Sequence, residues 1–185
     1  MLRAAFPTDL DFIRRVVVEG AADGSFDPEL AAPTPATALF FANLGSALRF
    51  GYLRTPDAAG NLTRDVHVAG YVYSSQEGSP AIGFGLFKEL ERGSFELWLT
   101  GVAAEARGLG HGHAMVGELL ATPAGQMAHV VRCNRRSATL DIAMRLFGNF
   151  GFALCRDTPA VLWLVNARAP PELMARIAHS PNLSP

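Results

Sequence analysis

The sequence predicts an α+β protein in which helices flank a mixed, mostly antiparallel sheet. Residues 48–102 contain short runs of alternating apolar and polar side chains separated by turn residues, a pattern typical of an antiparallel meander. The segments before and after this region place apolar residues at helical spacing. With 185 residues and a hydrophobic content of 49%, the chain is expected to form one domain, residues 1–185, with a sizeable core.

The N-terminal region predicts a short strand followed by two helices. Residues 2–5 are expected to form the strand. Thr8, with Asp11 three residues later, resembles a capping box, so a helix is expected from there to about Gly20. A second helix is expected to begin at Thr34, because a proline in the first turn follows this threonine. The residues between the two helices are expected to form a loop.

The remaining elements follow in a regular order. Strands are expected at residues 49–53, 66–73, 81–87, 94–102, 128–133, 152–155 and 161–165. Helices are expected after a glycine-rich turn near residue 110, around residues 140–147, and in a short C-terminal segment at 170–179.

Composition and charge exclude several classes of protein. The net charge of −1 gives no electrostatic footprint for nucleic acid, and no apolar run is long enough to span a membrane. The two cysteines, Cys133 and Cys155, favour a reducing compartment over a disulfide framework. Because the first residues lack the apolar core of a signal peptide, we expect a cytoplasmic protein.

The segment with the clearest functional pattern is a glycine-rich turn between a predicted strand and a predicted helix. Gly108, Gly110 and Gly112 alternate with other residues, so the backbone can adopt positive φ and a ligand can approach the main chain closely. The unpaired amides and the dipole at the start of the following helix favour an anion such as a pyrophosphate. Arg107 precedes the turn as an additional cation.

Two common phosphate-binding motifs do not fit this turn. In the dinucleotide fingerprint G-x-G-x-x-G, His113 would occupy the position of the third glycine. A Walker loop requires Gly-Lys-Ser/Thr, which the chain lacks. The pattern that does fit is [RQ]-x-x-G-x-[GA], present as residues 107–112 after a strand that ends in Val102.

This motif resembles the acetyl-CoA loop of the GCN5-related N-acetyltransferase (GNAT) superfamily. The order of predicted elements is also that of the acyl-CoA N-acyltransferase fold, a three-layer α/β/α arrangement. The resemblance implies that loop amides bind the pyrophosphate of acetyl-CoA and that the preceding strand diverges from its neighbour to admit the pantetheine arm. The implied cofactor-binding residues are Val102, Arg107, Gly108, Leu109, Gly110, His111, Gly112 and His113.

A second local motif is similar to the same family, with one departure. Residues 143–152 resemble the segment A-x-x-L-Y-x-x-x-G-F, but Phe147 occupies the position of a tyrosine that in many relatives protonates the leaving thiolate. Phenylalanine has no proton to donate, so the thiolate would leave unassisted or be protonated by water or another side chain. Phe147 also completes an apolar helical stripe, which predicts a core position.

Glu96 is the candidate general base. Transfer to an amine requires an uncharged nucleophile, so a carboxylate, a histidine or water must remove a proton. Glu96 lies six residues before Val102, the offset of the base glutamate in the histone-acetylating branch of the family. The alternative is a partly exposed strand residue paired with an arginine. Arg135 and Arg136 follow another predicted strand, where they would meet a 3′-phosphate, an acidic substrate or solvent.

We therefore expect an acetyl-CoA-dependent N-acetyltransferase that acts by direct attack of a primary amine of a small molecule or protein. A catalytically weak or inactive acyl-CoA-binding sensor of the same fold is the alternative, and a longer acyl group is compatible with the small Gly101. The expected partners are acetyl-CoA and the amine, without nucleic acid or membrane, and a homodimer is compatible with the sequence. No metal is expected, because His111 and His113 lack further ligands at suitable spacing.

Overall fold

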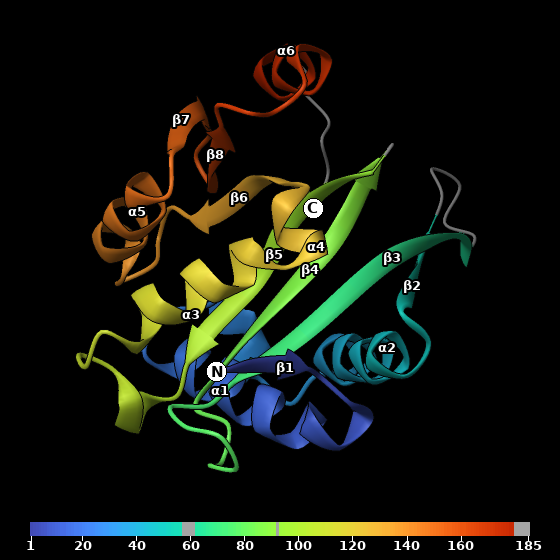
Figure 1. Cartoon of the computed structure of the whole chain (residues 1–185). Coiled ribbons are helices and arrows are strands. Elements are labelled where there is room, and N and C mark those ends of the chain that lie inside the picture. Colours follow the sequence, from blue (N-terminus) through green and yellow to red (C-terminus); the bar gives the residue numbers. More distant parts are fainter. Residues whose placement is uncertain (57–61, 92, 180–185) are drawn as a thin grey trace.

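In the computed structural model, which describes residues 1–56, 62–91 and 93–179, eight strands form one mixed sheet (Figure 1). The strands are β1 (Leu2–Ala4), β2 (Tyr52–Pro56), β3 (Leu62–Tyr73), β4 (Gly83–Glu91), β5 (Ser94–Val102), β6 (Ala128–Asn134), β7 (Phe152–Asp157) and β8 (Val161–Asn166). The helices are α1 (Leu10–Ala22), α2 (Pro35–Phe50), α3 (His111–Ala121), α4 (Pro123–Gln126), α5 (Leu140–Asn149) and α6 (Pro171–His179). Short 3₁₀ turns cover Pro7–Asp9, Pro28–Ala31 and Ala104–Ala106.

The sheet is mostly antiparallel. Its strand order is β1-β3-β4-β5-β6-β8-β7, and β2 pairs with β3 beside this path. Among the pairings of the described strands, only β5 with β6 is parallel. The segment from β5 to β6 contains α3, as expected because parallel neighbours need a crossover connection. The predicted α+β class and the meander from β2 to β5 are thus confirmed.

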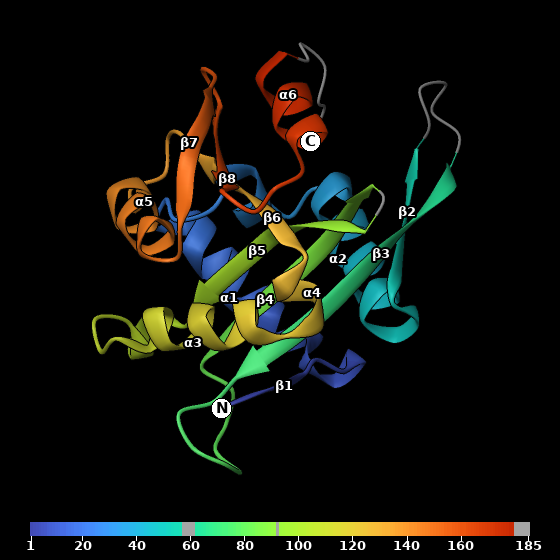
Figure 2. The same ribbon diagram turned by 45° about the horizontal axis from the view of Figure 1, so that its top comes forward.

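Helices cover both faces of the sheet and make it the middle of three layers (Figures 1 and 2). Side chains of α3, α4 and α5 pack against one face in a single apolar cluster. Helices α1 and α2 pack against the opposite face, where Val16 and Leu44 are completely buried. Alternation along β8 places α6 on the face opposite α5, because Leu162 and Leu164 face α5 while Trp163 and Val165 face α6.

Helix α3 lies unusually close to β4. A Cβ atom on Gly85 would lie 2.4 Å from Leu119 Cδ1, and one on Gly83 would lie 2.6 Å from Met115 Sδ. The absence of side chains at these two β4 positions therefore lets the apolar face of α3 approach the sheet directly. This contact fixes the helix whose first turn belongs to the glycine-rich segment.

The first helix begins differently from its prediction. Thr8 and Asp11 do not form the expected box, because residues 7–9 form a 3₁₀ turn and α1 begins at Leu10. Asp9 supplies the capping carboxylate instead, accepting a hydrogen bond from the Phe6 amide at 2.8 Å. The Arg3 guanidinium also donates to Asp9 and is the main cause that holds the pKa of this carboxyl below its ordinary value.

The boundary between α2 and β2 also differs from the prediction. Thr34 caps α2 as expected, its hydroxyl accepting from the Thr37 amide at 3.2 Å. Residues 49 and 50, however, belong to the helix and not to a strand. Gly51, with φ +78°, ends α2 in the left-handed conformation, so β2 begins only at Tyr52. The strands β3 and β4 are likewise longer or displaced relative to the predicted 66–73 and 81–87.

In residues 1–56, 62–91 and 93–179, no helix is both long and apolar enough to cross a membrane.

Candidate functional site

The glycine-rich segment forms a tight turn between β5 and α3. Gly108 and Gly110 have φ values of +79° and +81°, in the region that favours glycine. Gly110 is the N-cap residue of α3, whereas Gly112 lies within the first turn of the helix. Two of the three predicted glycines therefore take the left-handed conformation, and the third lies on the helix itself.

The amides of this turn are free to bind a ligand. Within the described part of the chain, the backbone N–H groups of residues 108–112 have no acceptor, whereas His113 and Ala114 donate to the Gly110 carbonyl. Successive free amides at the start of a helix, together with the helix dipole, form an anion-binding arrangement. The turn itself carries no acidic side chain that would repel an anion. Leu109 is 70% exposed, so the turn is accessible.

The strands β5 and β6 diverge on the side of the sheet that leads to this turn. Their parallel pairing covers only Phe95 to Leu97 on β5, although β5 continues to Val102. On β6, residues 132–134 pair only with β8 among the described strands. The ribbons separate beyond the last pair (Figure 1). An edge of β5 is therefore left unpaired inside the sheet, immediately before the glycine-rich turn.

Arg107 contacts protein atoms. Its Nε donates to the Val102 carbonyl at 3.0 Å, and its Nη1 forms an ion pair with Asp23 in the loop after α1. Burial raises the pKa of Asp23, but hydrogen bonds from Ser25 and Arg107 outweigh burial, so the pKa lies below its ordinary value. Arg107 thus connects the end of β5 to the loop after α1.

The two histidines of the turn lie beside aromatic rings. The His113 and Phe150 ring centroids are 4.8 Å apart, and those of His111 and Tyr73 are 6.3 Å apart. Among the described residues, no group of three His, Cys, Asp or Glu side chains is arranged to hold a metal ion. Both His111 and His113 lie in the first turn of α3.

Glu96 lies in a row of charged groups that crosses the sheet. Its side chain is completely buried. Arg132 Nε donates to Glu96 Oε1 at 2.5 Å, and Arg132 Nη2 donates to Oε2 at 3.0 Å. Lys88, the cross-strand partner of Glu96 on β4, places its Nζ 3.6 Å from Oε2. The paired arginine agrees with the structural alternative for this glutamate, whereas the expected partial exposure was wrong, because the side chain is completely buried.

Two tryptophans flank this row. Lys88 Nζ lies 5.1 Å from the centroid of Trp98, and Arg132 Cζ lies 5.1 Å from the centroid of Trp163. Burial is the main cause that lowers the pKa of Lys88, and the charge of Glu96 opposes part of this effect. The Lys88 and Arg132 side chains keep 15% and 13% of their surface exposed, so solvent reaches the row through its cations.

Sequence reasoning did not identify Lys88, Arg132 or Asp23. Arg132 gave a signal, because it is a single charge in the otherwise apolar run of β6. Lys88 and Asp23 gave none that distinguishes them from solvent-exposed charges. Their partners are separated from them in sequence by eight and 84 residues, so the pairs exist only after the sheet and the α1 loop have formed.

Three further residues that the sequence singled out are Phe147, Arg135 and Cys133. Phe147 is buried at 3% exposure and packs edge-on against Phe152, as its helical stripe predicted. Arg135 forms an exposed ion pair with Asp157 after β6. Cys133 is buried, and burial raises its pKa to about 11, so its thiol is protonated at neutral pH.

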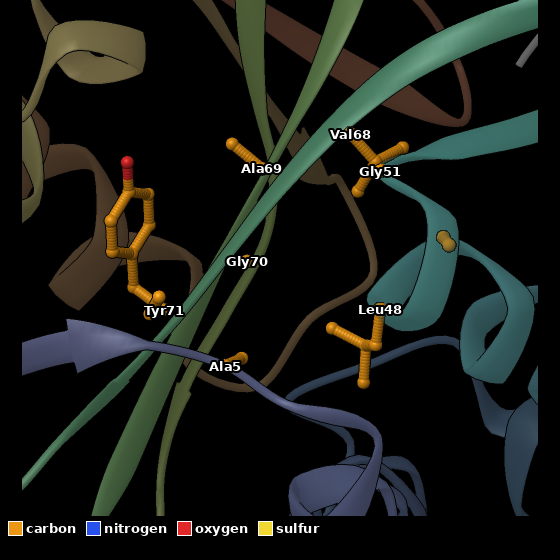
Figure 3. Close-up of a pocket in the computed structure, with 9 residues that line it drawn as sticks. Ala5, Leu48, Gly51, Val68, Ala69, Gly70 and Tyr71 are labelled. Atoms are coloured by element: carbon orange, nitrogen blue, oxygen red, sulfur yellow. The ribbon is translucent and has the colours of Figure 1, made fainter.

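A shallow pocket of about 250 Å³ lies elsewhere, between β1, β3 and the end of α2 (Figure 3). Its side chains are mainly those of alanines, Leu48 and Val68, and the Tyr71 side chain extends away from Leu48. With no cluster of titratable or nucleophilic groups in its lining, this pocket has no evident chemistry. The glycine-rich turn and the gap after Leu97 remain the candidate site.

Structural neighbours across most of the chain are GNAT N-acetyltransferases. One is a ribosomal-protein-alanine N-acetyltransferase from Brucella melitensis, with 16% identity, a TM-score of 0.57, and coverage of 89% of this chain and 97% of the neighbour. Another is a putative acetyltransferase from Salmonella typhimurium with its cofactor acetyl-CoA, with 15% identity, a TM-score of 0.58, and coverage of 92% and 96%.

A third neighbour is a GNAT superfamily phosphinothricin acetyltransferase from Sinorhizobium meliloti in complex with acetyl-CoA. It has 19% identity and a TM-score of 0.58, and the alignment covers 93% of each chain. No protein-family profile matches the chain, and no curated protein sequence matches it either. At these identities the comparisons show the fold, and two of the three neighbours named here contain acetyl-CoA.

Proposed function

We propose that this protein is an acetyl-CoA-dependent N-acetyltransferase that transfers an acetyl group to a primary amine by direct attack on the thioester. The observation that carries the proposal is the unpaired edge of β5, which leads from Leu97 into a turn with free amides. A strand edge can bind an amide-containing chain, and helix-start amides can bind a pyrophosphate, so both ends of the site fit the pantetheine and phosphate parts of acetyl-CoA.

The residues proposed to hold the cofactor are those of the turn and of the strand end. Amides of Gly108, Leu109, Gly110, His111 and Gly112 would bind the pyrophosphate. Val102 would contact the pantetheine arm, and a backbone amide near it would polarise the thioester carbonyl. Arg107 would act by fixing the turn through Val102 and Asp23, and His113 would lie beside the phosphate groups. Acetyl-CoA would supply the activated acyl group.

Glu96 is proposed as the proton acceptor, reached through Lys88. Because both Glu96 oxygens face cations and the side chain is buried, an acceptor amine cannot contact this carboxylate directly. Lys88 is partly exposed and its pKa is lowered, which suits a group that receives a proton from the substrate ammonium while passing one to Glu96. Lys88 would then be an ammonium before and after the transfer, and Glu96 would hold the additional proton.

Direct attack is favoured over a covalent enzyme intermediate by the state of the cysteine nearest the gap. Cys133 lies on β6, but its raised pKa keeps it as a thiol, which is a poor nucleophile. The buried Phe147 has no proton to donate, so the departing CoA thiolate would leave unassisted or take a proton from water or another side chain.

An acyl-CoA-binding sensor without transferase activity is the second candidate. The bidentate pairing of Glu96 with Arg132 and the absence of a hydroxyl at Phe147 favour it. A thiol-release assay with acetyl-CoA and a panel of primary amines separates the two functions. The transferase proposal expects stoichiometric free CoA with at least one amine. Acetyl-CoA binding without thiol release across small amines and peptides would support the sensor.

The proton relay has its own pH signature. In Glu96→Gln and Lys88→Met we expect turnover at pH 7 to fall by about 10²-fold or more, and to recover as the pH approaches the ordinary amine pKa of about 10. At high pH the acceptor amine is already uncharged and needs no proton acceptor. Acetyl-CoA affinity should change little.

The matched control is Glu89→Gln, which removes a β4 carboxylate that accepts only from the Gly93 amide among the contacts of the described chain. Its pH profile should follow the wild type. An equal loss of turnover at every pH in Glu96→Gln and Lys88→Met would contradict the relay and indicate a structural role.

A further inference from the structure

The loop after α1 is bonded to the segments that follow both β5 and β6. Asp23 forms an ion pair with Arg107, which follows β5. One residue later, the Gly24 carbonyl accepts a hydrogen bond from the Ala138 amide at 3.0 Å, and residue 138 follows β6. The loop is therefore bound to the chain on both sides of the diverging strands.

A second contact strengthens the attachment to the β6 side. The Ser137 hydroxyl donates to the Ser25 carbonyl at 3.3 Å, and the same hydroxyl is 3.0 Å from the Thr139 hydroxyl at the start of α5. With three consecutive residues of the loop held in this way, the position of the next residue, Phe26, is well defined.

The Phe26 ring occupies space that two glycines leave open. A Cβ atom on Gly101 of β5 would lie 3.1 Å from Phe26 Cζ and 3.3 Å from Cε2, and one on Gly20 of α1 would lie 2.5 Å from Cδ2. The ring also stacks on Phe84 of β4, with centroids 6.5 Å apart and planes 22° apart. Phe26 is thus fitted between α1 and the sheet, although its side chain remains half-exposed.

The Phe26 ring lies beside the unpaired stretch of β5. Gly101 lies beyond the last β5–β6 pair, which is at Leu97, and directly before Val102. This is the unpaired stretch of β5 along which the proposed function places the thioester end of the cofactor. We propose that Phe26 limits the length of the acyl group, so that acetyl is accepted and longer linear chains are excluded. The inference rests on the proposed acyl-CoA site.

The physical reason is the volume of the ring. The absence of a side chain at Gly101 would by itself leave room for a longer chain beside β5, but the Phe26 ring lies against this position. Apolar pockets discriminate substrates that differ by one methylene by roughly 10- to 200-fold. Butyryl is two methylenes longer than acetyl, so the ring is sufficient to produce a strong preference.

The test compares binding of CoA, acetyl-CoA and butyryl-CoA, measured by calorimetry, in the wild type and in Phe26→Ala. In the wild type we expect butyryl-CoA to bind at least about tenfold more weakly than acetyl-CoA. In Phe26→Ala the two affinities should become equal or reverse, while free CoA binds as in the wild type. Phe26→Leu keeps more of the apolar volume, so its ratio of butyryl-CoA to acetyl-CoA affinity should lie between those of the wild type and Phe26→Ala. This variant replaces Phe26→Ala in the test if the alanine variant folds poorly.

Two further variants make the result specific. Gly101→Ala in the Phe26→Ala background returns part of the apolar volume to the same place, with its Cβ atom 3.2 Å from Phe84 Cε1, and should restore part of the preference for acetyl-CoA. Phe12→Ala removes another half-buried phenylalanine of the same apolar cluster, one whose ring lies against Arg15, and should leave the preference unchanged.

The outcomes distinguish this inference from the function on which it rests. If the wild type binds none of the three ligands at millimolar concentration, the acyl-CoA site itself is wrong and the inference falls with it. If all three bind and Phe26→Ala keeps the wild-type ratio of butyryl-CoA to acetyl-CoA affinity, the role of Phe26 is wrong while the site stands. A ratio that shifts in Phe26→Ala and not in Phe12→Ala supports the inference.

Discussion

Arg132→Met is expected to lower the free energy of unfolding by about 3–5 kcal/mol, the range found when one partner of a buried ion pair is removed. Arg132 donates to both oxygens of Glu96, whose side chain is completely buried. Without Arg132 the carboxylate keeps, among the described residues, only the Lys88 ammonium, at 3.6 Å, and its buried side chain cannot reach bulk water. For a chain of this length, such a loss corresponds to a fall in Tm of roughly 10 °C.

A second substitution distinguishes loss of pairing from loss of packing. In the double variant Arg132→Met with Glu96→Leu, no carboxylate remains buried, so we expect most of the lost stability to return. The matched control is Arg135→Met, because Arg135 pairs with Asp157 at the surface, where both side chains are nearly half exposed. It should cost about 1 kcal/mol or less.

Urea unfolding of the four proteins measures these differences. If Arg132→Met were no less stable than Arg135→Met, the charged row across the sheet would not be a stabilising pair. If the double variant were no more stable than Arg132→Met alone, the unpaired carboxylate would not be the cause of the loss, and packing of the long arginine side chain against Trp163 would account for it.

Gly110→Glu is expected to weaken acetyl-CoA binding by about 100-fold or more. Gly110 has φ +81°, a conformation that costs other L-residues roughly 1–2 kcal/mol. The new carboxylate would also stand at the N-cap of α3, among the free amides that we propose to bind the pyrophosphate. The strain favours a turn in which the amides no longer converge, and the carboxylate repels the pyrophosphate. Each effect alone is expected to weaken acetyl-CoA binding by about tenfold.

Gly78→Glu provides a control with the same backbone strain. Gly78 has φ +76° in the turn between β3 and β4, and a Cβ atom there would meet no heavy atom within 4 Å. The variant should lose a similar amount of stability and keep its acetyl-CoA affinity. Equal affinity in Gly110→Glu and the wild type would show that the turn does not bind the cofactor.

Local patterns predicted the elements of the candidate site more successfully than they predicted some element boundaries. Strand β5 was predicted at residues 94–102 and occurs there. Its apolar alternation did not predict its burial, because Glu96 is completely buried whereas Phe95 is only partly buried. The glycine-rich turn and the start of α3 were also predicted, since Gly108 and Gly110 permit the positive φ that this turn adopts. The boundary at Gly51 was missed because residues 48–53 fit helical and alternating patterns equally well, and only the left-handed glycine decides between them.

The ion pairs of the charged residues at the candidate site depend on tertiary structure. Glu96 meets Arg132 across 36 residues, and Asp23 meets Arg107 across 84. Periodicity describes which face a side chain occupies, but it does not specify which distant charge shares that face. The bulge at Trp98, which shifts the β4–β5 register between Leu97 and Leu99, is also set by pairing. The contact between the Phe26 ring and Gly101 likewise joins residues that are distant in the sequence.

Calorimetric titration of the wild-type protein with acetyl-CoA tests the central claim most directly. We predict saturable binding with one molecule per chain. At about 100 times the Kd this binding should stabilise the fold by about 2.7 kcal/mol and raise Tm by roughly 5–10 °C. No heat of binding and no shift in Tm at millimolar acetyl-CoA would contradict the proposal that the gap after Leu97 and the turn at residues 107–113 form an acetyl-CoA site.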